Sequence, residues 1–135
     1  MKTAIALLAT LAAILFVLGA GSAPAQGRYN KAAFEKVMEQ ANRENRVLLG
    51  SLIAANWGRA GSTAETIEEL SAEIRTLTPK RNTDRIDHFR ATADSLGVWA
   101  GRLAAAAEAE DGRQISEAFG KMVGACVHCH ATFRE

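Results

Sequence analysis

From residue 30 onward, apolar side chains recur in steps of three and four, the spacing that places them on one face of a helix. Four such stretches follow one another, over 30–54, 62–77, 86–103 and 115–133. The composition is rich in alanine, leucine and glutamate, which favours helices. The sequence therefore predicts four amphipathic helices. The expected inward positions are Phe34, Met38, Ala41, Leu48 and Leu52; Ile67, Leu70, Ile74 and Leu77; Ile86, Phe89, Ala93, Leu96, Ala100 and Leu103; and Ile115, Phe119, Met122, Cys126, Cys129 and Phe133.

Turn and capping signals separate the four helices. Ser62 is followed three residues later by a glutamate, a capping box that predicts the start of the second helix after a break over 56–62. Pro79 ends this helix, and Asp111 with Gly112 makes the short turn before the fourth. Short connections favour antiparallel neighbours. The predicted fold is therefore all-α, an antiparallel up-down-up-down four-helix bundle.

The first 27 residues, MKTAIALLATLAAILFVLGAGSAPAQG, have the layout of a secretory signal peptide. One basic residue precedes an apolar run from Ala4 to about Leu18, and an Ala-Pro-Ala triplet ends at Ala25. The apolar run is shorter than the roughly 20 residues that a membrane-spanning helix needs. We expect residues 1–25 to be a signal peptide cleaved after Ala25, with an uncleaved anchor as the alternative. The mature chain is then exported, with no stable membrane insertion.

Residues 26–135 form one domain, since a chain of about 110 residues can bury one hydrophobic core but not two. Removal of the signal peptide takes away one charged residue, Lys2, and leaves 15 basic and 15 acidic residues. Such a balanced chain gives no reason to propose nucleic acid or anionic lipid as a partner. The sequence also lacks a Ser/His/Asp set, paired inward carboxylates and a phosphate-binding loop, so it gives no case for an enzyme.

The two cysteines of the chain both lie in its last ten residues, CVHCHATFRE. A thioredoxin-like redox dithiol would need a strand-to-helix junction, and no strand is predicted here. A zinc site would need four converging ligands, whereas His128 lies about 200° round a helix from His130, or about 160° by the shorter way. A disulfide between Cys126 and Cys129 suits an exported protein but leaves His130 without a role.

Cys126, Cys129 and His130 also have the spacing of the c-type haem attachment signature. Two thiols one helical turn apart can reach the vinyl-derived positions on one edge of a porphyrin, and the adjacent histidine can bind the iron on the proximal side. All three share the helix face that carries Phe119 and Met122, so we expect that face to look into the core. We interpret the motif as the attachment site of one covalent haem c and its iron.

The ending AFGKMVGACVHCHATFRE resembles that of the cytochrome c′ and cytochrome c556 family. In both, an apolar last helix carries Cys-x-x-Cys-His close to its end, here followed by Phe133 and Arg134. The resemblance implies a periplasmic four-helix-bundle haem protein with redox partner proteins, and it allows a homodimer. It also implies that Arg134 could pair with a haem propionate, although a solvated terminal arginine is an equally good interpretation.

The sixth position of the iron decides the mechanism. In an antiparallel bundle the end of the fourth helix and the start of the first lie together, which places Met38 at the same end as His130. The family resemblance implies that a methionine in this part of the first helix can bind the iron, although a methionine on an apolar stripe is usually core. Met122 is excluded, because it lies about 12 Å from His130 along the same helix. His128 is expected to point into solvent, and His88 to flank the site.

Two functions follow from these assignments, and a third needs no haem. With His130 and Met38 both on the iron, the protein would shuttle single electrons between periplasmic partners. Without Met38 the iron would be five-coordinate and, as the resemblance to cytochrome c′ implies, able to bind nitric oxide or another small gas. A small helical binding domain with a disulfide is the third alternative. The presence of Met38 favours electron transfer.

Overall fold

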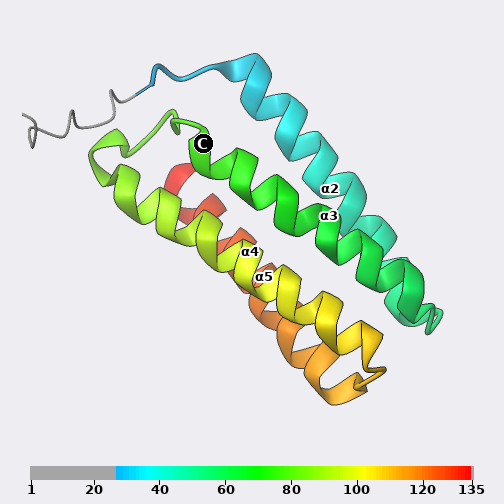
Figure 1. Cartoon of the computed structure of the whole chain (residues 1–135). Helices are drawn as coiled ribbons and strands as arrows, with labels where there is room; N and C mark the ends of the chain where they lie inside the picture. The colour runs from blue at the N-terminus through cyan, green and yellow to red at the C-terminus, as the bar shows by residue number, and fades with distance from the viewer. Residues whose placement is uncertain (1–26, 135) are drawn as a thin grey trace, which may run out of the picture.

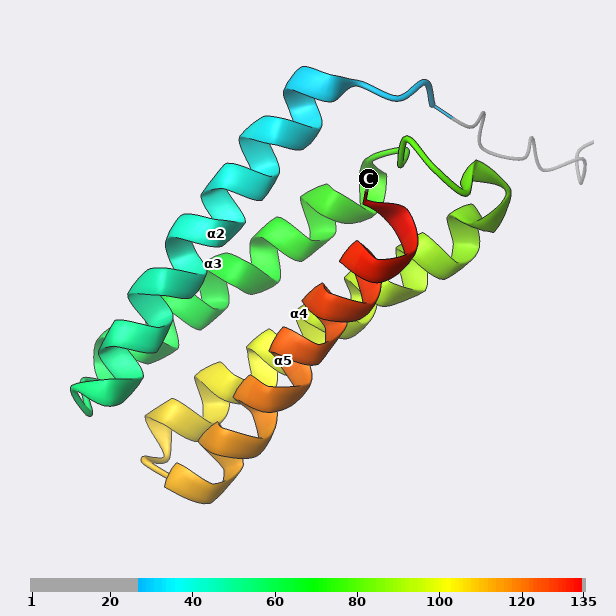
Figure 2. The ribbon, with the colours of Figure 1, turned by 180° about the vertical axis from the view of Figure 1, so that it is seen from behind.

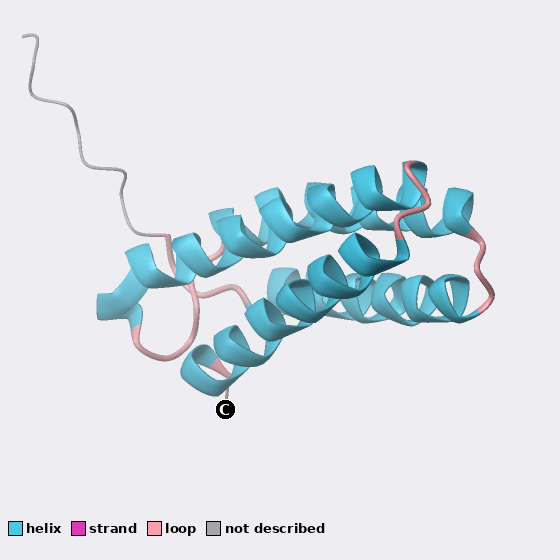
Figure 3. Cartoon of the chain, turned by 90° about the horizontal axis from the view of Figure 1, so that it is seen from below, coloured by secondary structure: helices cyan, strands magenta, loops and turns pink. Residues whose placement is uncertain are grey.

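The computed structural model describes residues 27–134, so the predicted signal peptide lies outside the described residues. Helices joined by loops make up this part of the chain, and no strand occurs within residues 27–134 (Figure 3). For this part of the chain, the prediction of an all-α fold with four helices is confirmed. The helices are α2 (Lys31–Ile53), α3 (Trp57–Thr76), α4 (Ile86–Glu108) and α5 (Gly112–Phe133), with a 3-10 turn η1 (Thr83–Arg85) before α4.

Each helix packs against its neighbour in the sequence, α2 on α3, α3 on α4 and α4 on α5, with successive helices running in opposite directions (Figure 1). The first and last helices have no such contact. Within the described chain, no Cα of α2 lies within 8 Å of a Cα of α5. The bundle is therefore open along one side, between residues 31–53 and residues 112–133 (Figure 2). We call this side the α2–α5 seam.

The turns after α2 and α4 are built alike. Each contains a residue with a left-handed backbone, Ala55 in one and Glu110 in the other, both at a φ of 52°. The next residue, Asn56 or Asp111, donates its backbone N–H to the carbonyl five residues earlier, at 2.9 and 3.0 Å. This bond is the mark of a Schellman motif, which ends a helix by satisfying its last carbonyls. Both turns therefore reverse the chain within three residues, which makes the neighbouring helices antiparallel.

The start of the second helix differs from the prediction, which placed it at Ser62. Helix α3 begins at Trp57, because the Asn56 side chain accepts a hydrogen bond from the backbone N–H of Arg59 at 3.1 Å and caps the helix. Ser62 lies inside α3, where its hydroxyl donates to the carbonyl of Arg59 at 3.2 Å. The capping-box prediction is therefore wrong, and the break between the first two helices is shorter than expected.

The N-cap of α5 makes a pH-dependent contribution to stability. One carboxylate oxygen of Asp111 accepts the backbone N–H groups of Arg113 and Gln114 at 3.1 and 3.0 Å, and the other accepts the Gln114 side chain at 2.7 Å. The hydrogen bond from the Gln114 backbone is the main reason that the pKa of Asp111 lies below its ordinary value of 3.8. A lowered pKa means that the stabilisation is complete above that ordinary value and is lost as pH falls through the folded-state pKa.

We expect Asp111→Ala to melt a few degrees below the wild type at about pH 5 to 7, because α5 loses its cap. The deficit should shrink when the pH falls below 3.8, where the wild-type carboxylate is itself becoming protonated. Thermal melts followed by circular dichroism across this pH range measure the effect. Asp111→Asn is the control, since its amide oxygen can cap the helix at every pH. A deficit of Asp111→Ala that stays constant into acid would contradict the assignment.

The hydrophobic core follows the predicted stripes of α3, α4 and α5 closely. Of the expected inward positions on these helices, only Leu77, Phe119 and the two cysteines are half-buried rather than buried. The buried ones are Ile67, Leu70, Ile74, Ile86, Phe89, Ala93, Leu96, Ala100, Leu103, Ile115, Met122 and Phe133. These three helices therefore hold a continuous core along the bundle.

Helix α2 is rotated relative to the prediction. Its most buried side chains are Val37 and Leu48, at 1% and 0% exposure, rather than the whole predicted stripe. Phe34 and Met38 of that stripe are only half-buried. The reason is that α2 packs its backbone against α3 alone, so its buried line turns toward α3. Phe34 and Met38 therefore lie at the side of this buried line, on the flank of α2 that does not face α3.

Helices α3 and α4 approach each other closely in the middle of the bundle. A Cβ placed on Gly97 of α4 would overlap the hydroxyl of Ser71, which lies opposite on α3. One turn later, a Cβ on Gly101 would lie 2.9 Å from a carboxylate oxygen of Glu68. The small residues of α4 thus allow the close packing of α3 and α4, in contrast to the open α2–α5 seam.

Candidate functional site

Aromatic rings line the end of the bundle that carries the Cys-x-x-Cys-His motif. The start of α2 and the last turn of α5 both lie at this end (Figures 1 and 2). Phe89 of α4 is 1% exposed, and its ring centroid lies 6.0 Å from that of Phe34 on α2 and 5.2 Å from that of Phe133 on α5. Tyr29 extends the row, 5.7 Å from Phe34. Phe89 thus connects α2 and α5 through side chains at this end, although the backbones of the two helices are not in contact.

The two cysteines are half-buried free thiols, one turn apart on α5. Burial raises the pKa of the Cys126 thiol. Burial, and then the neighbouring charge of Cys126, raises the pKa of Cys129 to about 11. Both groups are therefore protonated near neutral pH. Reactive dithiols of the thioredoxin type have a lowered pKa instead, so the direction of these shifts disfavours a redox dithiol.

His130 lies on the surface of α5 rather than in the core. The prediction that its face looks inward is wrong for this residue, since His130 is exposed while Cys126 and Cys129 are half-buried. Partial burial of the ring lowers the pKa of His130, and the positive charge of Arg134 lowers it further. The imidazole is therefore neutral near pH 7, the form that binds metals.

Helix α5 has two distinct flanks at this end. His128 lies on the flank next to α4, where its Nε2 atom is 2.9 Å from Nε2 of His88. Cys126 and His130 are both about 160° from His128 around the helix. Cys126 and His130 therefore lie on the flank of α5 that is turned away from α4, between the buried face that carries Met122 and the solvent-exposed face. This flank borders the α2–α5 seam.

Met38 lies on the flank of α2 that borders the same seam. Phe34, one turn earlier on this flank, reaches across the interior to the Phe89 ring, which shows that the flank faces inward. Met38 is half-buried there and packs against the core. Two turns further along lies Asn45, whose Oδ1 atom is buried without a hydrogen-bond partner among the described residues. A thioether and a polar side chain therefore line one border of the seam, and a thiol and an imidazole line the other.

The remaining candidates fall outside this seam. Met122 is 1% exposed and belongs to the core, as the sequence indicated. His128 is exposed, as expected, but it is paired with His88 rather than simply solvated. The sequence alone could not predict that pair, because it depends on how α4 and α5 are aligned along their axes. Within residues 27–134, no group of three or more His, Cys, Asp or Glu side chains is arranged to hold a metal ion, so these residues do not form a zinc-type ligand set.

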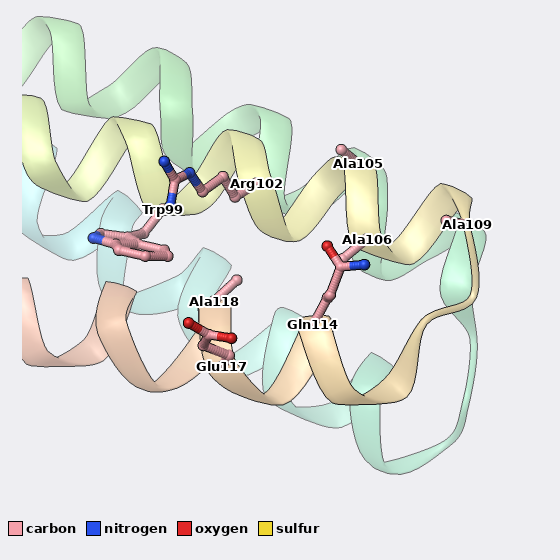
Figure 4. A pocket seen from close by; sticks show the side chains of 8 residues that line it. All are labelled: Trp99, Arg102, Ala105, Ala106, Ala109, Gln114, Glu117 and Ala118. Atoms are coloured by element: carbon pink, nitrogen blue, oxygen red, sulfur yellow. The ribbon is translucent and has the colours of Figure 1, made fainter.

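A shallow groove lies between the second half of α4 and the first half of α5, toward the opposite end of the bundle from the motif (Figure 4). Trp99 and Arg102 form the α4 side, with the guanidinium carbon 4.5 Å from the indole centroid. Gln114 and Glu117 form the α5 side. No thiol, imidazole or thioether lines this groove. It is therefore separate from the candidate site.

A four-helix bundle whose last helix ends with Cys-x-x-Cys-His is the arrangement of a helical c-type haem protein. Comparison with family models agrees, since residues 25–134 match the model described as cytochrome c′. The chain belongs to the cytochrome c′ family. This membership implies a c-type cytochrome with covalently bound haem c. No curated protein and no solved structure matches the chain significantly.

The residues that border the seam fit a covalent haem c. Both thiols are free and lie one helical turn apart, the spacing that two thioether bonds to one porphyrin edge require. The neutral imidazole of His130 lies on the same flank as Cys126, and the two helices leave the seam between them unpaired. The buried Oδ1 of Asn45 is a polar group that the protein itself leaves unsatisfied on this side. No helix within residues 27–134 is long and apolar enough to cross a membrane.

Proposed function

We propose that the protein is a periplasmic electron carrier that holds one haem c through Cys126 and Cys129, with His130 and Met38 as the two axial ligands of the iron. The observation that carries the proposal is the α2–α5 seam. One border holds Cys126 and His130 on α5, and the other holds Met38 on α2. The backbones of these two helices are not in contact, so a flat ligand between them does not have to displace a packed interface.

Haem c supplies an iron that accepts and returns one electron. The protein contributes the environment around it. The thiols of Cys126 and Cys129 would hold the group as thioethers, which fixes its edge against α5. The neutral imidazole of His130 would bind from this side, and the thioether of Met38 from the other. Two protein ligands leave no open position on the iron, and methionine ligation raises the reduction potential. Both effects suit an electron carrier.

Arg134 is proposed to pair with a propionate of the haem. Its guanidinium already acts on the neighbouring His130, whose pKa it helps to lower. Arg134 is exposed and follows directly on the last turn of α5. A cation there can reach a carboxylate at the rim of the seam, where an exposed pair contributes at most about 1 kcal/mol. Its role is therefore to orient rather than to stabilise.

The cellular location is proposed on two grounds. Members of the cytochrome c′ family are typically periplasmic, and residues 1–25 read as a cleavable signal peptide. The proposed mature domain is residues 26–135, and the family match over residues 25–134 supports one domain in this part of the chain. Its partners would be periplasmic redox proteins. A homodimer is compatible with the fold.

Replacing Met38 by leucine tests the sixth ligand. We expect the purified wild-type haem protein to give a sharp low-spin spectrum on reduction and a weak near-infrared sulfur-to-iron band when oxidised. Met38→Leu should lose that band, become high-spin and bind nitric oxide, because leucine keeps the volume of methionine but offers no ligand atom. Its reduction potential should fall, since methionine ligation raises it.

Met122→Leu is the matched control. It makes the same chemical change at a methionine that is buried in α5, and its spectrum should stay that of the wild type. A high-spin spectrum shared by the wild type and Met38→Leu would overturn Met38 as a ligand. The protein would then be the five-coordinate member of the family that binds nitric oxide or a similar gas. Absence of any haem after expression with the maturation machinery would overturn both.

A further inference from the structure

A pair of histidines lies beside the haem motif but on the opposite flank of α5. His88, in the first turn of α4, and His128, in the last part of α5, approach each other with 2.9 Å between their Nε2 atoms. Their rings are nearly perpendicular, with an interplanar angle of 85° and centroids 5.1 Å apart. The proposed haem site uses neither of them. The two imidazoles therefore form a feature that the proposed function leaves unexplained.

The local structure holds both rings in place. His88 also contacts the ring of Phe133, with centroids 5.9 Å apart, and Phe133 is buried against Phe89. Near the last turn of α5, the amide of Asn82 donates to the Thr132 carbonyl at 2.6 Å and ties this turn to the loop before α4. These contacts fix the last turn of α5 relative to the start of α4, next to the pair. Two imidazoles held by a fixed scaffold lose little freedom when they bind a common ligand.

The separation of the two nitrogens matches that of two adjacent ligands on one metal ion. Imidazole nitrogens bind divalent metals at about 2.0 to 2.1 Å. Two such nitrogens that subtend a right angle at the metal lie about 2.9 Å apart, whereas a tetrahedral angle separates them by about 3.3 Å. The 2.9 Å between His88 and His128 equals the right-angle value. Ions with square-planar or tetragonal nitrogen coordination are Cu²⁺ and Ni²⁺.

We propose that His88 and His128 form a two-histidine site on the surface for a divalent ion of the Cu²⁺ or Ni²⁺ type. In the metal-free protein one imidazole donates its Nε2 proton to the other. When both Nε2 atoms bind the ion, that proton moves through solvent to Nδ1 of the same ring, so both imidazoles bind in their neutral form. No third His, Cys, Asp or Glu in the described chain joins the pair, so water takes the remaining positions on the metal. His128 is exposed and His88 is half-buried, which leaves the ion an open path from solvent.

The site ties α4 to α5 next to the haem motif without using the haem ligands. His128 lies between Cys126 and Cys129 in the sequence, but it is about 160° from His130 around the helix. An ion there would bridge two helices that the unfolded chain does not hold together. Binding should therefore stabilise the folded protein by an amount that grows with the logarithm of the ion concentration once this exceeds the dissociation constant.

Titration of the haem-loaded, oxidised protein with Cu²⁺ tests this site. Isothermal titration calorimetry should show that one ion binds per chain, and the affinity for this ion should fall when either histidine is replaced. We expect His88→Gln and His128→Gln each to weaken binding at least tenfold. Electron paramagnetic resonance of the bound Cu²⁺ should show splitting from two imidazole nitrogens. The melting temperature of the wild type should rise with added Cu²⁺, and that of each variant should not.

Asp87→Asn is the matched control. It removes the carboxylate next to His88 on α4, which is almost fully exposed and pairs with Arg90 at 3.7 Å, but it leaves both imidazoles in place. Its Cu²⁺ affinity should stay within about threefold of the wild type. An ion bound by the amino terminus would occur equally in the wild type and in every variant, so it does not affect the comparison between them. The proposal is overturned if neither glutamine variant binds more weakly, if only one of them does, or if Asp87→Asn loses as much affinity as they do.

Discussion

A chain that carries Cys126→Ala and Cys129→Ala together is expected to contain no covalent haem and to unfold without a sharp cooperative transition. The physical reason is the α2–α5 seam, where the protein alone makes no backbone contact between its first and last helices. The flanks that border the seam carry half-buried apolar side chains, among them Phe34, Met38 and Phe119. If the haem fills the seam as proposed, its absence leaves these side chains facing water, and the hydrophobic stabilisation that their full burial would add is lost.

The measurement combines two readouts on the protein exported with the haem maturation machinery. Haem absorption that remains after denaturation reports covalent attachment, and a circular dichroism melt reports cooperativity. Val127→Ala is the matched control, because Val127 lies between the cysteines and is 63% exposed. It should keep both the haem and the sharp transition. A double-alanine variant that melts as cooperatively as the wild type would show that the four helices close without the haem.

Phe89→Ala is expected to lower the free energy of unfolding by about 3 to 5 kcal/mol. Phe89 is 1% exposed, so its removal leaves a cavity. Its ring also contacts Phe34 and Phe133, and each aromatic pair contributes about 0.5 to 1.5 kcal/mol beyond the buried area. Among the described residues, Phe89 alone connects these rings of α2 and α5, so its loss should loosen the end of the bundle that carries the Cys-x-x-Cys-His motif.

Urea denaturation of the haem-loaded protein measures this loss. Phe89→Leu is the informative comparison, since leucine fills much of the space but makes no ring contacts, and it should cost about 1 to 3 kcal/mol from the two lost aromatic pairs. The difference between the two variants then separates the cavity from the aromatic contacts. A cost for Phe89→Ala below that of Phe89→Leu would mean that the ring does not hold the end of the bundle together.

The sequence predicted the helices better than it predicted their faces. The first helix was expected over 30–54 and spans Lys31–Ile53, because a periodic stripe of this length leaves little freedom in its ends. Its buried line nevertheless differs from the predicted one. Periodicity identifies an apolar face but not which neighbour that face meets. In this bundle α2 has one backbone neighbour instead of two, so Val37, which lies off the predicted stripe, is buried while Met38 is only half-buried.

The second helix shows how competing local signals mislead. Asn56 and Ser62 are both good N-cap residues, and the glycines between them suggested a break. The outcome depended on the turn before the helix. The Schellman bond from Asn56 ends α2 so abruptly that Asn56 is already in position to cap α3. A residue that ends one helix through its backbone N–H and caps the next through its side chain is difficult to recognise from sequence, because helix ends and helix starts are predicted separately.

Within the candidate site, the sequence identified residue types and their spacing along α5, but not the relations between helices. The Cys-x-x-Cys-His motif could be recognised because all of its members lie within five residues. The contact between His88 and His128 joins residues 40 positions apart, and it needs the axial alignment of α4 with α5. The exposure of His130 likewise depends on the open seam beside it.

The order of packing also bears on how the chain folds. Because every helix packs only on its neighbours in the sequence, the backbone contacts between helices are local along the chain, and such topologies fold quickly. Helix α2 is held by one interface, whereas α3 and α4 each have two. Its detachment therefore costs less than global unfolding and exposes the thiol-bearing flank of α5 while the other three helices stay packed.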